Sequence, residues 1–168
     1  MRAQPGEGPL ESFWRNARRH AHVESIVPAY FGAGALELVT PPAWSFGSTP
    51  EQADELLDLV LSGEKTATAS AAWDYEAEGE PLPKVGELSI VTDSQGRPRA
   101  LLQTTSVDVR PFDEVDAEHA YLEGEGDRSL EFWRRVHEQF FTDHAEHGHG
   151  FSMTMPVVLE RFDLLYSA

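Results

Sequence analysis

The chain has 168 residues with 13 basic and 29 acidic side chains, a formal net charge of −16 and no cysteine. This length predicts one domain with a sizeable core, and 40% hydrophobic residues are too many for a disordered chain. The lack of cysteine excludes disulfides and thiolate metal sites, while the acidic charge disfavours a long nucleic acid unless the few basic residues gather on one face.

The opening of the chain, residues 1–10, is polar and lacks the apolar stretch of a signal peptide, and no apolar run is long enough to span a membrane. We therefore expect a cytoplasmic location and no membrane partner. Residues 10–30 predict a helix that carries Phe13 on its apolar side and ends near Pro28. The same segment holds the densest basic cluster, which we interpret as a solvated helix face: Arg15, Arg18 and Arg19.

The clearest helix signal lies between Thr49 and Gly63. Thr49 can cap the helix, Pro50 suits the first helical position and Gln52 completes a capping-box spacing. Apolar residues then recur with helical period until Gly63, a residue typical of a helix C-terminus. Before this helix, residues 40–47 read as a connector.

Downstream of Gly63 the apolar pattern changes to a period of two, which is typical of strands. We expect strands at residues 65–73, 87–92 and 99–109. The segment Asp93-Ser94-Gln95-Gly96 predicts a hairpin turn between the last two of them.

The last third of the chain predicts a helix and then closing strands. Residues 129–141 show a broad apolar helical face, and residues 153–165 form one or two strands with an edge or a bulge at Pro156. Five or six strands with three helices indicate a compact α+β domain of the small β-barrel type. No repeat or second core is visible, so we expect one globular unit at residues 41–168 after an N-terminal extension with a helix at residues 1–40.

The segment that follows the clearest helix carries the most suggestive chemistry. Gly63-Glu64-Lys65-Thr66-Ala67-Thr68-Ala69-Ser70 sets a lysine among hydroxyls where the predicted helix ends and a strand begins. If burial favoured its neutral form, Lys65 could act as a base, and a lysine base beside a hydroxyl is one route to an activated nucleophile. The alternative reading is a surface lysine followed by threonines, which favour strands.

Three sequence motifs follow one another with a definite order and spacing. They are the lysine segment Gly63–Ser70; Pro111-Phe112-Asp113-Glu114-Val115 with His119-Ala120 and Glu123-Gly124-Glu125-Gly126-Asp127; and Ser129-Leu130 with Trp133, His137 and Phe140-Phe141. In this order they resemble the ASCH domain family, and its longer bacterial members in particular, over residues 44–165. The resemblance implies a PUA-like β-barrel with flanking helices, related to RNA-binding domains, with a cleft lined by the lysine segment.

The resemblance also implies an activity. Small bacterial ASCH proteins hydrolyse the amide of N4-acetylcytidine with a lysine, a threonine three residues later and a glutamate. By motif, these roles fall on Lys65, Thr68 and Glu123, with Glu125 open as the alternative glutamate. The predicted function is therefore an amidohydrolase that removes an acyl group from N4-acylated cytidine or a related small nucleoside amide. The alternative is an RNA-binding module or a single-strand ribonuclease, the activity described for another branch of the family.

In the predicted mechanism, Lys65 takes the proton of Thr68 as its hydroxyl attacks the amide carbonyl, and Glu123 positions Lys65 or protonates the departing amine. Lysine and threonine three residues apart point to opposite faces of a flat strand, so the scheme needs a turn or bulge between them. This chain has Ala69 and Ser70 where the small amidohydrolases have a bulky residue and an arginine, so the wall of the pocket differs.

The residues predicted to bind the substrate surround these three: Thr66, Ser70, Trp73 and Glu125. Trp73 and the nearby Tyr75 could stack on a base, or they could instead pack in the core or a loop. We expect His119 and His137 to be structural.

No cofactor and no metal site is predicted. The loop that contains His144, His147 and His149 could supply metal ligands. A loop of Asp, Glu, His and Gly after a helix is, however, typically solvated.

The RNA alternative requires the basic residues to converge on one groove: Arg15, Arg18, Arg19, Lys65, Lys84, Arg97 and Arg99. The expected partner is thus a small nucleoside-like substrate, with single-stranded RNA as the alternative and the oligomeric state left open.

Overall fold

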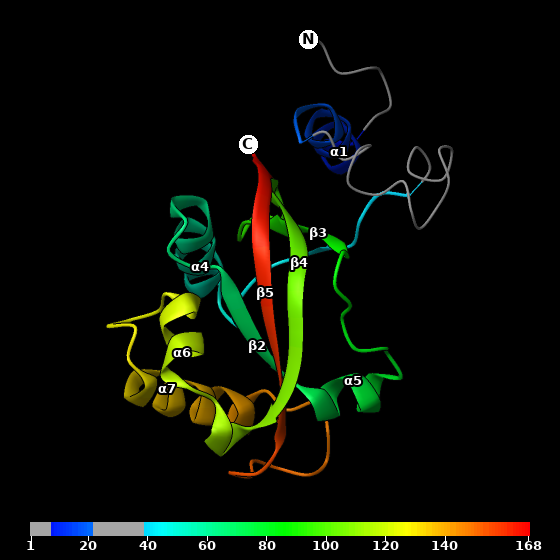
Figure 1. Ribbon diagram of the computed structural model, residues 1–168. Helices are drawn as coiled ribbons and strands as arrows, with labels where there is room; N and C mark the ends of the chain where they lie inside the picture. Colours follow the sequence, from blue (N-terminus) through cyan, green and yellow to red (C-terminus); the bar gives the residue numbers. More distant parts are fainter. Residues whose placement is uncertain (1–7, 22–38) are drawn as a thin grey trace. The chain divides into compact units, whose positions relative to one another are not determined.

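The structure of the protein is a computed structural model that describes residues 8–21 and 39–168. Five described strands form one mixed sheet in the order β1-β3-β4-β5-β2 (Figure 1). In chain order, the described elements are α1 (Pro9–His20), β1 (Ala43–Trp44), α4 (Pro50–Ser62), β2 (Ala67–Ala71), α5 (Ala72–Glu78), β3 (Leu88–Thr92), β4 (Pro98–Pro111), the 3-10 helix η1 (Phe112–Glu114), α6 (Ala117–Glu123), α7 (Leu130–Asp143) and β5 (Pro156–Ser167). The predicted α+β class is confirmed.

The described chain divides into two compact units, and the long strands β4 and β5 contribute residues to both. The first unit contains the described residues up to 61 together with 88–103 and 164–168, and the second contains residues 62–87 and 104–163. Every residue of the predicted site belongs to the second unit.

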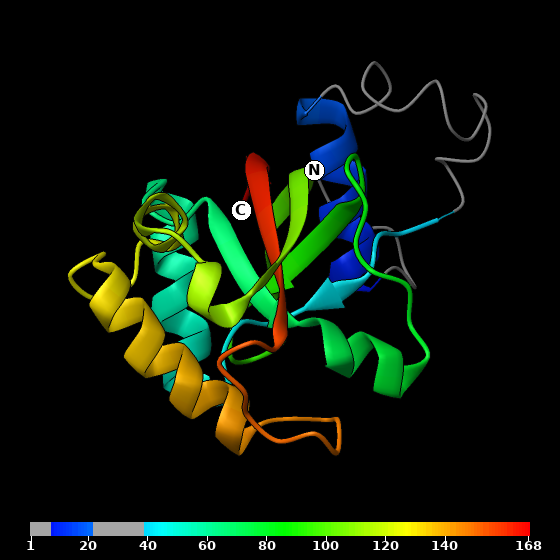
Figure 2. The same cartoon turned by 60° about the horizontal axis from the view of Figure 1, so that its bottom comes forward.

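In the first unit, α1 packs on β3 and β4 (Figure 2). Phe13, Trp14 and Ala17 of the helix share a buried apolar cluster with Ile90 and Leu101 of the strands. Burial of such large apolar side chains contributes about 1.5–3 kcal/mol each, so this cluster fixes the helix on the sheet. The predicted continuation of the helix to Tyr30, including its end near Pro28, lies outside the described residues.

The capping signal at the start of α4 is confirmed. The Gln52 N–H donates to the Thr49 hydroxyl at 3.2 Å, and the Gln52 side-chain oxygen accepts from the Ser48 N–H at 3.0 Å. The reciprocal bond thus reaches one residue further back than the capping-box spacing predicts. After the helix, Gly63 has a φ of +83°, a conformation that favours glycine.

In the second unit, β2 pairs antiparallel with β5, in a register that runs from Ala67 opposite Arg161 to Ala71 opposite Val157. Helices α6 and α7 cover one face of these strands (Figure 2). The buried cluster between them includes Phe112, Ala120, Trp133, Phe141, Met155 and Leu159. This core holds the C-terminal end of α6 beside the start of β2, where the Thr66 N–H donates to the Leu122 carbonyl at 2.8 Å.

Three local predictions are corrected. The strand expected at residues 65–73 ends at Ala71, and Trp73 lies instead in α5, which stops at Gly79 with a φ of +69°. The connector expected at residues 40–47 contains the short strand β1, which pairs parallel with β3. Helix α6 was not predicted at all, because its few apolar residues give no periodic pattern over seven positions.

Helix α7 begins at a side-chain cap, since the Ser129 hydroxyl accepts from the Phe132 N–H at 3.1 Å. Replacing Ser129 with alanine leaves this N–H without its partner, so we expect a loss of about 1 kcal/mol in the free energy of unfolding, measured with urea. Ser129→Thr keeps an oxygen acceptor and should retain most of the stability. Equal losses for the two variants would contradict a capping role.

Among the described helices, none combines the length and the apolar character needed to cross a membrane.

Candidate functional site

Lys65 lies between α4 and β2, and only 2% of it is exposed. Its Nζ is 3.5 Å from Glu123 Oε2 and 3.4 Å from Glu125 Oε2, and it donates to the Glu123 carbonyl at 3.4 Å. A buried ammonium loses its hydration, which costs several kcal/mol unless carboxylates replace the water. The two glutamates supply that replacement, so the structure brings together the predicted catalytic pair Lys65 and Glu123, with Glu125 beside them.

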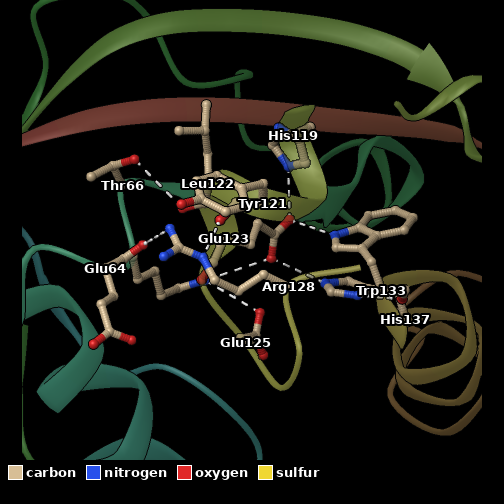
Figure 3. A network of polar contacts seen from close by, with 11 residues as sticks. Glu64, Thr66, His119, Tyr121, Leu122, Glu123, Glu125, Arg128, Trp133 and His137 are labelled. Atoms are coloured by element: carbon tan, nitrogen blue, oxygen red, sulfur yellow. Dashed lines mark hydrogen bonds and ion pairs between the residues drawn. The ribbon is translucent and has the colours of Figure 1, made fainter. Parts of the chain in front are cut away.

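Glu123 lies at the C-terminal end of α6 and is 1% exposed (Figure 3). Its Oε1 accepts hydrogen bonds from His119 Nε2 at 2.7 Å and Trp133 Nε1 at 2.8 Å. Its Oε2 faces His137 Nε2 at 3.3 Å as well as Lys65. With donors around both oxygens, the carboxyl group is built to be an ionised acceptor.

These neighbours set the protonation states of the cluster. Burial alone would raise the pKa of Glu123, but the positive charges of Lys65 and His137 and the hydrogen bond from His119 hold that pKa well below its usual value. Burial would lower the pKa of His137, but the Glu123 carboxylate raises it. Burial raises the pKa of Glu125, Lys65 opposes this rise, and the charge of Glu123 adds to it. The two glutamates thus have pKa values shifted in opposite directions, a pattern common at sites of proton transfer.

These shifts predict how stability depends on pH. Because the pKa of Glu123 lies below its usual 4.5, its contribution is present above pH 4.5 and is lost as the pH falls through the folded pKa. Because the pKa of His137 lies above its usual 6.5, its contribution is present below pH 6.5 and is lost as the pH rises through the folded pKa. Glu125 acts in the same direction as His137, since a raised carboxyl pKa removes stability as the pH rises above 4.5. Urea unfolding at a series of pH values should therefore show falling stability above pH 6.5, and His137→Gln should reduce that fall. A wild-type stability that keeps rising to pH 8 would contradict these assignments.

A tight glycine contact places the two glutamates next to the lysine. Gly124 separates Glu123 from Glu125 and has a φ of +74°, which ends α6 in a left-handed conformation. A Cβ atom at this position would lie 2.6 Å from the Glu64 carbonyl oxygen and 3.1 Å from the Lys65 nitrogen. Only glycine allows the backbone to approach so closely, so the Gly-Glu-Gly pattern of the motif has a steric cause.

Arg128 ties the same loop to the lysine segment (Figure 3). Its Nε donates to the Tyr121 carbonyl at 2.9 Å, and its Nη2 donates to the Glu64 carbonyl at 3.1 Å. The guanidinium lies over the Tyr121 ring, 3.7 Å from the ring centroid. Arg128 has a φ of +63°, which is uncommon for a residue with a side chain. These contacts join the end of α6 to the residue that precedes Lys65.

The hydroxyl side chains of the lysine segment take no part in the hydrogen bonds of this cluster. Thr66 is bound to α6, since its N–H donates to the Leu122 carbonyl at 2.8 Å and its hydroxyl approaches the same oxygen at 3.5 Å. Ser70 shares a hydrogen bond of 3.1 Å with the Tyr75 hydroxyl. Thr68 lies within β2 opposite Glu160, and no hydrogen bond joins its hydroxyl to another described residue. Lys65 precedes the first residue of β2 by two positions, so the two predicted catalytic residues do not lie in one regular strand.

Trp73 is half-buried on the core of the second unit and is covered by histidines from the loop after α7. Its ring lies 5.1 Å from that of His147 and 4.5 Å from that of His149. His147 Nδ1 accepts from the His149 N–H at 3.2 Å, and its Nε2 lies 3.8 Å from Asp74 Oδ1. The core-packing alternative therefore describes Trp73 in this structure, and its role in binding a substrate stays a prediction.

One group of potential metal ligands occurs among the described residues, at Glu123, Glu125 and His137, whose ligand atoms lie within 4.8 Å of one another. The Lys65 ammonium lies 3.5 Å and 3.4 Å from the two carboxylates, in the place where a cation would neutralise them. These residues are arranged for a lysine rather than for a metal ion.

Three further residues complete the site around the Glu123 carboxylate. It accepts hydrogen bonds from His119 and Trp133, and His137 is its charged neighbour. The sequence predicts a structural role for the two histidines and marks Trp133 only as a residue of the third motif. The available signal was the spacing of four residues between His119 and Glu123, which places both side chains on one face of a helix. That signal was invisible because α6 itself was not predicted.

Comparisons with known proteins agree with this architecture. The family model of the ASCH domain matches residues 42–166. The crystal structure of an ASCH domain from Lactobacillus crispatus JV V101 is 32% identical in sequence, with a TM-score of 0.73, and the match covers 90% of this chain and 95% of that chain. A crystal structure of a protein from Enterococcus faecalis V583 is also 32% identical, with a TM-score of 0.78, over 93% of this chain and 87% of that chain. A search of curated proteins found no match.

The chain belongs to the ASCH domain family. The predicted resemblance, which covered residues 44–165, is thereby confirmed, and the PUA-like fold is consistent with the five-stranded sheet and its flanking helices.

Proposed function

We propose that this ASCH protein is an amidohydrolase that removes the acyl group from N4-acylated cytidine or a related small nucleoside amide. Membership of the family supports a hydrolase-like or RNA-binding role. The observation that carries the more specific proposal is the burial of Lys65 against two glutamates with opposite pKa shifts. Such a cluster costs stability to bury and is more typical of proton transfer than of structural support.

In the proposed reaction, Glu125 takes a proton from Lys65, since burial raises the pKa of this carboxyl and its Oε2 lies 3.4 Å from Nζ. The neutral amine of Lys65 then accepts the hydroxyl proton of Thr68 as the Thr68 oxygen bonds to the amide carbonyl carbon. The C–N bond breaks as Lys65 passes that proton to the departing cytidine amine, and water then hydrolyses the ester, which releases the acid and restores the Thr68 hydroxyl. Glu123, held ionised by His119 and Trp133, keeps Lys65 in position.

The test is the release of cytidine from N4-acetylcytidine by variants at the two reacting positions. We expect Lys65→Ala to lower kcat by about 10²–10⁴-fold, the usual contribution of acid–base catalysis. Thr68→Ser keeps a hydroxyl and should retain activity, whereas Thr68→Val keeps the shape and should lose it. Equal activity of Thr68→Val and wild type would remove Thr68 from the mechanism while leaving Lys65 in place.

Single-stranded RNA binding or cleavage is the second candidate, supported by the family alone. It was predicted to need Lys65 in a basic groove, but Lys65 is 2% exposed and is paired with carboxylates. Arg97 and Arg99 both lie near the Asp93 carboxylate, at 2.7 and 3.9 Å. A small uncharged substrate therefore suits the described residues better than a polyanion.

A further inference from the structure

A second polar site lies beside the Lys65 cluster, in a cavity of about 240 Å³ in the second unit. Residues of β4, β5 and the start of α6 line it, and His119 forms part of its wall. Two arginines and two aspartates lie around it: Arg110, Arg161, Asp108 and Asp116. The cavity and the Lys65 cluster thus share His119, which bonds to Glu123 and also lines the cavity.

His119 offers a hydrogen-bond acceptor at this wall. Its Nε2 is 2.7 Å from the Glu123 carboxylate, and an ionised carboxylate can only accept, so Nε2 carries the proton. In the neutral ring with this tautomer, the lone pair is on Nδ1. Nδ1 has no hydrogen-bond partner among the described residues, although the His119 side chain is only 4% exposed. A hydroxyl or N–H of a bound molecule would satisfy it.

The charges around the cavity favour an uncharged ligand. Arg110 Nε donates to Asp108 Oδ2 at 2.6 Å, and Arg161 Nη2 lies 3.5 Å from Glu118 Oε2. The two arginines of the lining are matched by two aspartates. The lining therefore has no excess positive charge that could offset the cost of desolvating a phosphate. The guanidinium groups still offer N–H donors, and Asp116 offers carboxylate oxygens beside His119.

The size and composition of the lining narrow the ligand further. Sites for whole ligands usually measure about 300–1,000 Å³, so this cavity suits a fragment of about one sugar or one base. A base usually stacks on an aromatic side chain. The lining contains one apolar residue, Leu159, and one ring, that of His119. Carboxylate, guanidinium and imidazole groups suit a sugar with several hydroxyls.

We propose that this cavity binds the ribose of an unphosphorylated nucleoside, with one ribose hydroxyl donating to His119 Nδ1. The inference rests on the proposed function for the choice of a nucleoside, and it names the substrate as the free nucleoside rather than a nucleotide or RNA. Ribose held at His119 would place the nucleoside next to Glu123 and Lys65.

The experiment is a titration followed through the ¹⁵N resonances of the His119 ring, with cytidine, cytosine and cytidine 5′-monophosphate as probes. Cytidine should shift the Nδ1 resonance and bind about tenfold more tightly than cytosine, which lacks the ribose hydroxyls. The monophosphate should bind no more tightly than cytidine. Unchanged Nδ1 resonances with millimolar cytidine, equal affinity for cytosine, or tighter binding of the monophosphate would each overturn the inference.

A matched pair of variants on β4 locates the binding. Ser106 is exposed and lines the cavity, so Ser106→Phe should fill it and raise the Kd for cytidine by about tenfold or more. Thr105 is the exposed neighbour, whose side chain points to the other face of the strand, so Thr105→Phe should leave the Kd unchanged. Equal affinities of the two variants would place cytidine elsewhere.

The two proposals fail separately. Binding of cytidine at His119 without hydrolysis of N4-acetylcytidine would refute the proposed function and leave the ribose site in place. Hydrolysis that is equally fast for N4-acetylcytosine and N4-acetylcytidine would refute the ribose site and leave the amidohydrolase.

Discussion

Glu123→Gln should lower the free energy of unfolding by about 3–5 kcal/mol, the usual cost of removing one partner from a buried ion pair. The amide keeps the shape of the carboxyl group but removes its charge and turns an NH₂ group toward donors. Lys65, His119 and Trp133 then compete for one carbonyl oxygen, because all three donate to Glu123 or face it in the wild type. Urea unfolding monitored by Trp fluorescence measures the change.

Helix α6 provides the matched control for this substitution. Glu118 lies five positions earlier in the same helix, and its side chain is 68% exposed with Arg161 Nη2 at 3.5 Å. An exposed pair of this kind contributes about 0–1 kcal/mol, so Glu118→Gln should change stability little. Equal losses at the two positions would show that the helix, rather than the buried cluster, determines the effect.

Gly124→Ala is expected to have the second largest effect, a loss of about 2–4 kcal/mol that combines backbone strain with overpacking. The new Cβ would lie 2.6 Å from the Glu64 carbonyl oxygen, in a residue whose φ is +74°. To relieve the clash, the segment that carries Lys65 must move away from Glu123 and Glu125. The variant should therefore lose hydrolytic activity as well as stability.

A substitution at Gly79 measures the backbone strain without the overpacking. It ends α5 with a φ of +69°, close to that of Gly124, but nothing lies within 4 Å of the position of its Cβ. Gly79→Ala should cost only the left-handed backbone conformation, about 1–2 kcal/mol, and leave activity unchanged. If Gly124→Ala were no worse than Gly79→Ala, the close approach to Glu64 would have no energetic importance.

The elements with strong local signals were predictable. The Thr49-Pro50-Gln52 pattern located the start of α4, and the turn at residues 93–96 located the β3–β4 hairpin, where the Gly96 N–H donates to the Asp93 carbonyl at 2.9 Å. The short elements β1, α5 and α6 were missed, because two to seven residues are too few for a hydrophobic period to appear. Their positions depend on tertiary packing instead.

The candidate site was likewise only partly predictable from the sequence. Lys65 stood out as a possible base from the hydroxyls around it, but Glu123 and its pairing with Lys65 were predicted only through the family resemblance, since nothing local shows that the two residues meet across 58 positions of the chain. The parts supplied by α6 and α7, namely His119, Trp133 and His137 around one carboxylate, required the packing of two helices that the sequence did not place together. The contact of Gly124 with Glu64 is likewise visible only in three dimensions, although the glycine itself belongs to the motif.

The central claim is that Lys65 and its glutamates hydrolyse a nucleoside amide, and the most direct test follows N4-acetylcytidine by proton NMR with wild type and Lys65→Ala. We expect equal amounts of cytidine and acetate from the wild type, and product formation at least about 10²-fold slower from a folded Lys65→Ala variant. No turnover by the folded wild type, or equal turnover by the two proteins, would contradict it.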